Sequence, residues 1–120
     1  MFIIQAQMIA FRKIAKRNFG KRLAEYFDAG YEGKLSHAGE RIPTGSVLED
    51  LIFELITVAE SFGLTEELGV GQFVALGLGY SRTFYEIERV AKLLKDPAFT
   101  AEQNVQRVLN AVVVAEARAA

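Results

Sequence analysis

The chain has 120 residues, close to the commonest size of a single domain, and 51% of them are hydrophobic. It contains no cysteine, which excludes disulfides, thiolate metal sites and a cysteine nucleophile. The formal net charge of −1 neither favours nor disfavours a polyanionic partner. We therefore expect one domain over residues 1–120, with a fold that depends on packing alone.

The amino-terminal residues do not have the pattern of a signal peptide. The apolar run Met1-Phe-Ile-Ile ends at Gln5 and has no charged leader. The most apolar stretch is interrupted by Gly69, Gly71 and Gln72, so it falls short of the ~18–20 apolar residues of a membrane span. We expect a soluble protein without a cleaved leader, and the absence of cysteine fits a cytoplasmic one.

Residues 5–29 show the periodicity of a first helix. Its apolar side chains recur at steps of three and four residues and form one face: Met8, Phe11, Ala15, Phe19, Leu23, Tyr26 and Phe27. Gly30 follows them, where a left-handed helix cap is expected. Residues 30–46, with four glycines and Pro43, are predicted to form a loop with one short turn near residues 36–40. A loop of this length is often functional or mobile, which makes it a candidate contact segment.

A second helix is predicted to begin at Ser46. The pattern Ser46-Val-Leu-Glu49 has the form of a capping box, in which the two polar side chains satisfy free backbone donors of the first turn. The apolar residues of this helix share one side: Leu48, Leu51, Ile52, Leu55, Ile56 and Ala59. The acids Glu49, Asp50 and Glu54 fall largely away from that side, and Gly63 ends the helix.

The third predicted helix, about residues 66–79, is the most distinctive segment. Thr65 is placed to cap it, and acids in its first turn complement the helix dipole. A helix that is apolar on nearly all sides must be enclosed by others, so we expect this one at the centre of the fold. Gly71 and Gly77 would let a crossing helix approach closely. A strand over residues 72–78 is the alternative, because short apolar runs are ambiguous. The apolar side chains of the helix are Leu68, Val70, Phe73, Val74, Leu76 and Leu78.

Two further helices complete the predicted fold. One covers about residues 84–95 and stops at Asp96-Pro97, because the residue before proline is pushed out of helical geometry. The other follows a second capping-box pattern, Thr100-Ala-Glu-Gln103, and is lined by Val105, Val108, Leu109, Val112 and Val113. We therefore predict an all-α, single-domain bundle of about five helices around the central apolar helix.

Charge is distributed unevenly along the chain. Residues 1–24 hold six basic side chains and no acid, whereas residues 25–67 hold ten acids against Lys34 and Arg41. We expect surfaces of both signs on the outer helix faces, where a partner could bind. The candidate partner-binding residues are Arg12, Lys13, Lys16, Arg17, Lys21, Arg22, Glu49, Asp50 and Glu54.

No motif predicts a catalytic, cofactor or metal site. His37 is the only histidine, and a lone histidine in a glycine-rich loop is typical of a solvated side chain. Glu54 and Glu86 could act as an acid–base pair only if a cleft held them together with separated pKa values. Gly69-Val-Gly71 begins like a dinucleotide fingerprint, but Val74 stands where the third glycine belongs and no strand precedes it. We expect no enzyme activity and no cofactor.

Several short motifs occur in a fixed order along most of the chain. They are Phe11, Phe19 and Arg22, then Leu51-Ile52, then Ala59-x-x-Phe-Gly-Leu-Thr-Glu66, then Val70, Phe73, Leu76, Gly79 and Phe84, and finally Leu94-x-Asp96-Pro97. This pattern resembles a group of small, uncharacterised bacterial proteins often encoded beside type VI secretion spike or toxin genes. The resemblance implies an accessory role, as an immunity protein, chaperone or adaptor for a secreted effector, and carries over no catalytic residue.

The leading functional hypothesis is therefore a non-enzymatic protein-binding module whose partner is another protein, such as a secreted toxin or spike component. The alternative is a nucleic-acid-binding protein that lays the basic face of its first helix along a phosphate backbone. No aromatic platform interleaves those cations, and no separate recognition helix is predicted. A third hypothesis, an enzyme using Glu54, Glu86 or His37, requires a sizeable polar cleft.

Overall fold

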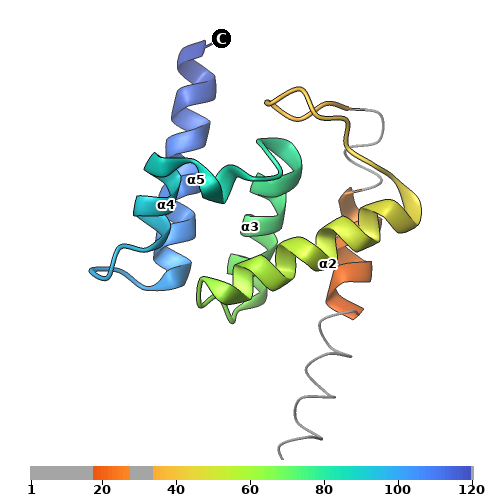
Figure 1. Cartoon of the computed structure of the whole chain (residues 1–120), viewed down its shortest axis with the longest axis horizontal. Coiled ribbons are helices and arrows are strands. Elements are labelled where there is room, and N and C mark those ends of the chain that lie inside the picture. The colour runs from red at the N-terminus through yellow and green to blue at the C-terminus, as the bar shows by residue number, and fades with distance from the viewer. Residues whose placement is uncertain (1–17, 28–33, 120) are drawn as a thin grey trace, which may run out of the picture.

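The structure is a computed structural model that describes residues 18–27 and 34–119, with side chains to residue 114. The first helix is described over residues 18–27, and the later elements are α2 (Gly45–Ser61), α3 (Glu67–Gly79), the 3-10 turn η1 (Phe84–Glu86), α4 (Glu88–Leu94) and α5 (Ala101–Ala119) (Figure 1). The described ranges contain no strand and only one isolated antiparallel bridge, between Leu35 and Arg41. The predicted all-α bundle of about five helices is confirmed. The start of the predicted first helix and its Gly30 cap lie outside the described residues.

Helix α3 lies at the centre of the bundle. It packs against α2 and α5, and Figure 1 shows it between them. Its Phe73 and Val74 side chains are fully buried, and Leu76 and Leu78 are nearly so. Each buried side chain of this size contributes roughly 1.5–3 kcal/mol to the free energy of folding. The strand alternative over residues 72–78 is wrong, because these residues lie within a continuous 13-residue helix.

Gly77 is the point of closest approach between α3 and α2. A Cβ atom at this position would lie 2.6 and 2.7 Å from the two Cδ atoms of Leu55, which is itself buried in the core. No side chain fits there without displacing Leu55. The prediction that a glycine of α3 allows close helix crossing is therefore confirmed for Gly77, whereas nothing lies within 4 Å of a Cβ built on Gly71.

The starts of α2 and α3 differ from the predicted caps. Gly45, with a φ of +59°, lets the chain enter α2 one residue early, so Ser46 is already inside the helix and no side-chain capping bond forms. The helix α3 begins at Glu67, not after a Thr65 cap. Instead, Oε1 of Glu102 in α5 accepts hydrogen bonds from the backbone N–H groups of Thr65 (3.1 Å) and Glu66 (3.4 Å). Both predicted caps were wrong.

Other predicted ends are confirmed. The Thr100 N–H donates to Oε1 of Gln103 (2.9 Å) and the Gln103 N–H to Oγ1 of Thr100 (3.1 Å), which is the reciprocal capping box expected before α5. Gly63 follows the last turn of α2 with a φ of +88°.

The predicted fourth helix is interrupted, because Ile87 is extended and separates η1 from α4. This break allows Phe84 to be fully buried, with its ring centroid 4.8 Å from that of Phe73.

The described part of the predicted loop folds back on itself and docks on the end of α3. The predicted short turn is present, with the Ser36 N–H donating to the Glu40 carbonyl (2.8 Å). The backbone N–H groups of His37 and Ala38 donate to the carbonyls of Gly79 (2.8 Å) and Tyr80 (2.9 Å). These bonds satisfy carbonyl groups at the C-terminal end of α3 that have no partner within the helix.

Gly77→Ala should make the protein less stable than Gly71→Ala by about 1–3 kcal/mol. Both substitutions gain the same helix propensity, up to ~1 kcal/mol, but only the first forces a methyl group into Leu55. Urea unfolding followed by circular dichroism gives both free energies. Equal stabilities of the two variants would contradict the packing role assigned to Gly77.

Glu102→Ala should lower the free energy of unfolding at pH 7 by about 1 kcal/mol, the usual cost of losing an N-terminal cap. The hydrogen bond from the Thr65 N–H is the main reason why the pKa of Glu102 lies below its ordinary value of 4.5. The ionised form therefore stabilises the folded state above pH 4.5, and that contribution is lost as the pH falls through the lowered pKa.

The difference between wild type and Glu102→Ala should accordingly shrink in acid, in unfolding curves measured at a series of pH values. Glu88→Ala is the matched control, because Glu88 is also an acid in the first turn of a helix but is exposed, and its ion pair with Lys92 lies on the surface. A difference that is constant with pH would show that the carboxylate of Glu102 is not the stabilising group.

Candidate protein-binding site

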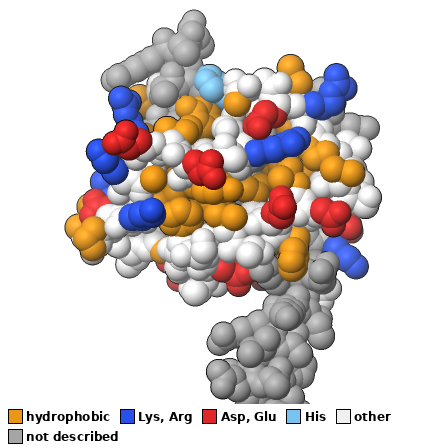
Figure 2. Space-filling model, in the orientation of Figure 1, with side chains coloured by type: hydrophobic (Ala, Val, Ile, Leu, Met, Phe, Trp, Pro, Cys, Tyr) orange, Lys and Arg blue, Asp and Glu red, His pale blue; other side chains and the backbone are white. Residues whose placement is uncertain are grey.

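The acidic candidate residues lie on the outer side of α2. Glu49, Asp50 and Glu54 are all exposed, and the α2 sequence contains no basic residue. On the face of the molecule seen in Figure 2, however, the acidic side chains stand apart from one another, with apolar and basic side chains between them. The view shows no continuous acidic surface on this face.

Two of the basic candidate residues are described, Lys21 and Arg22, and both are exposed. Nη2 of Arg22 lies 3.2 Å from Oε1 of Glu67 in α3, and its guanidinium group lies over the ring of Phe19 at 5.4 Å from the centroid. Arg22 is therefore directed toward an acid of the neighbouring helix. The other basic candidates lie outside the described residues: Arg12, Lys13, Lys16 and Arg17.

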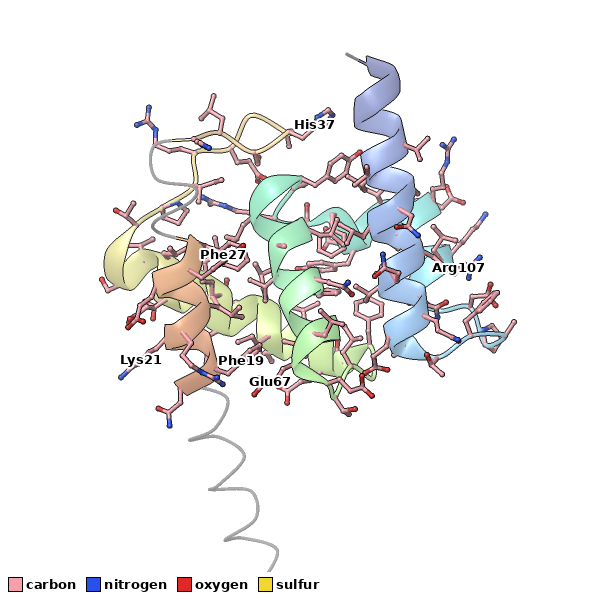
Figure 3. All side chains as sticks on the ribbon, turned by 180° about the vertical axis from the view of Figure 1, so that it is seen from behind. Phe19, Lys21, Phe27, His37, Glu67 and Arg107 are labelled. Atoms are coloured by element: carbon pink, nitrogen blue, oxygen red, sulfur yellow. The ribbon has the colours of Figure 1, made fainter. Side chains whose placement is uncertain are left out.

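An apolar groove of about 520 Å³ runs between the first helix and α3, beside this ion pair. Figure 3 shows the two helices next to each other, with Phe19 and Glu67 near one end and Phe27 further along. Among the described residues, the lining is mostly apolar and Glu67 is its only charged member. The groove is lined by Phe19, Leu23, Tyr26, Phe27, Glu67, Leu68, Gly71, Gln72 and Ala75.

Large apolar side chains are exposed at the groove. The Leu68 side chain is 73% exposed and Tyr26 is 72% exposed. Between them Gly71 leaves open space, because no described atom from outside its own stretch of helix lies within 4 Å of a Cβ placed on it. Single exposed apolar residues are common on protein surfaces, whereas apolar residues gathered around one groove are more typical of interaction sites.

Leu68 is one of the residues that the sequence pattern placed on an apolar helix face but that are exposed; the others are Tyr26, Ile87 and Val113. The prediction enclosed α3 on all sides, which is correct for Val70 and Phe73 but wrong for Leu68. A usable signal was present: Leu68, Gly71, Gln72 and Ala75 follow the i, i+3, i+4, i+7 spacing of one helix face. A face that combines two small residues with an amide is a poor core face, and in the structure the first helix covers it only in part.

Of the residues considered for catalysis, His37 contacts Tyr80, whereas Glu54 and Glu86 both lie near Tyr85. His37 lies on the loop, with its ring stacked on Tyr80 at 5.0 Å between centroids. Burial raises the pKa of the Tyr85 hydroxyl above its ordinary value of 10.0, and the nearby carboxylates of Glu86 and Glu54 raise it further. Both carboxylates thus lie near Tyr85, on exposed positions. Among the described residues, no three histidine or acidic side chains are grouped so that they could hold a metal ion.

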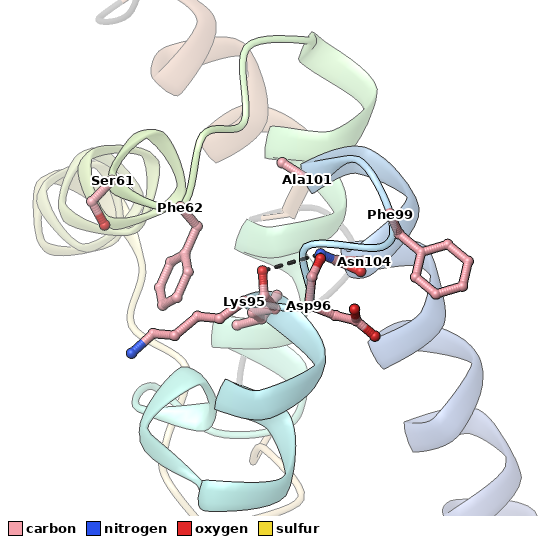
Figure 4. Close-up of a pocket in the computed structure, with 8 residues that line it drawn as sticks. Ser61, Phe62, Lys95, Asp96, Phe99, Ala101 and Asn104 are labelled. Carbon is pink, nitrogen blue, oxygen red and sulfur yellow. Dashed lines mark hydrogen bonds between the residues drawn. The ribbon is translucent and has the colours of Figure 1, made fainter.

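A second cavity, of about 570 Å³, lies between the end of α2 and the connection from α4 to α5 (Figure 4). Its buried polar residue, Asn104, already has its hydrogen bonds: Nδ2 donates to the carbonyls of Leu94 (3.2 Å) and Asp96 (3.0 Å), and Oδ1 accepts from Arg107 (3.2 Å). Arg107 also pairs with Asp96 at 3.0 Å and lies over the ring of Phe99. These contacts hold the α4–α5 connection in place.

No protein-family model, curated protein or solved structure matches the chain. Within residues 18–27 and 34–119, no helix has the length and apolar character needed to cross a bilayer.

Leu68→Ala should change the free energy of unfolding by no more than about 0.5 kcal/mol, because the side chain is exposed. The same substitution at Leu76, on the buried face of the same helix, should cost about 2–5 kcal/mol. Urea unfolding of the two variants makes the comparison. A large loss of stability for Leu68→Ala would mean that this residue belongs to the core.

Proposed function

We propose that this protein is a non-enzymatic protein-binding accessory module that uses the groove between the first helix and α3 as its contact surface. The observation that carries the proposal is the exposure of Leu68 and Tyr26 around the open space at Gly71. Covering these side chains removes apolar surface from water, which is the main driving force of protein association. Depletion of charge inside the groove, with polar groups at its edge, is typical of the centre of a protein interface.

The form of the groove favours a helix as the bound element. Two neighbouring helices provide its walls, and an amphipathic helix can lay its apolar face into such a space, with anchors at i, i+3, i+4 and i+7. An accessory role of this kind, as an immunity protein, chaperone or adaptor for a secreted effector, is also what the resemblance in the sequence implies. The exposed acids Glu49, Asp50 and Glu54 on α2 are further side chains that such a partner could contact.

Binding to nucleic acid has less support from the described residues. Phosphate contacts need free cations along a face, whereas Arg22 is directed toward Glu67 and borders an apolar groove. We therefore retain protein binding as the proposed function.

The test compares what an affinity-tagged protein retains from its native host when the groove is intact or altered. Leu68→Glu places a charge in the groove and should reduce the recovered partner at least tenfold, a loss of about 1.4 kcal/mol or more in binding free energy. Val47→Glu is the matched control, since Val47 is also apolar and 62% exposed but lies on α2, away from the groove lining.

Retention of the same partner by wild type and Val47→Glu, with loss in Leu68→Glu, supports the proposal. A second copy of the chain counts as a partner in this assay. Equal recovery with all three proteins, or no protein retained by any of them, would show that the groove is not a binding site. Circular dichroism of each variant establishes that the fold is intact.

A further inference from the structure

We draw no further inference here: the strongest candidate, the apolar groove between the first helix and α3, belongs to the site already described, and nothing in the described part of the structure shows what covers its exposed Leu68 and Tyr26 side chains.

Discussion

At Gly77 the backbone of α3 comes so close to Leu55 of α2 that no side chain could stand between them, and this contact sets how deeply α3 sits in the bundle. The depth places Phe73 beside Phe84 and gives α5 a surface to pack on. Because α3 packs against α2 and α5, one side of this helix remains to be covered. That side carries Leu68 and Gly71, and the first helix covers it incompletely.

The features that the sequence predicted well depend on neighbours along the chain. Helical periodicity located α2, α3 and α5, and the reciprocal pair Thr100 and Gln103 identified the start of α5 because both partners lie within one turn. The start of α3 could not be found in the same way. Its donors are satisfied by Glu102, 37 residues after Thr65, and no local pattern carries that information.

The candidate site was harder to predict than the fold for a related reason. Charged residues can be identified directly in the sequence, and they were the predicted contact residues. The groove instead depends on which apolar side chains the other helices leave exposed. Leu68 and Leu76 contribute equally to a hydrophobicity pattern. Only the arrangement of the other helices determines that Leu76 is buried and Leu68 is exposed. The spacing of Gly71, Gln72 and Ala75 indicated a helix face with little apolar surface. The groove forms because the first helix lies beside this face, and the sequence does not predict that position.

The bond from Glu102 to the segment before α3 also has a consequence for the order of folding. The central helix cannot satisfy its first backbone donors until the opening turn of the final helix has docked against it. A chain still emerging from the ribosome would hold α2 and α3 without that bond, and with Val105 and Val108 absent from the core. Such long-range contacts cost loop-closure entropy before they stabilise anything. The bundle therefore completes its core only after α5 has been synthesised.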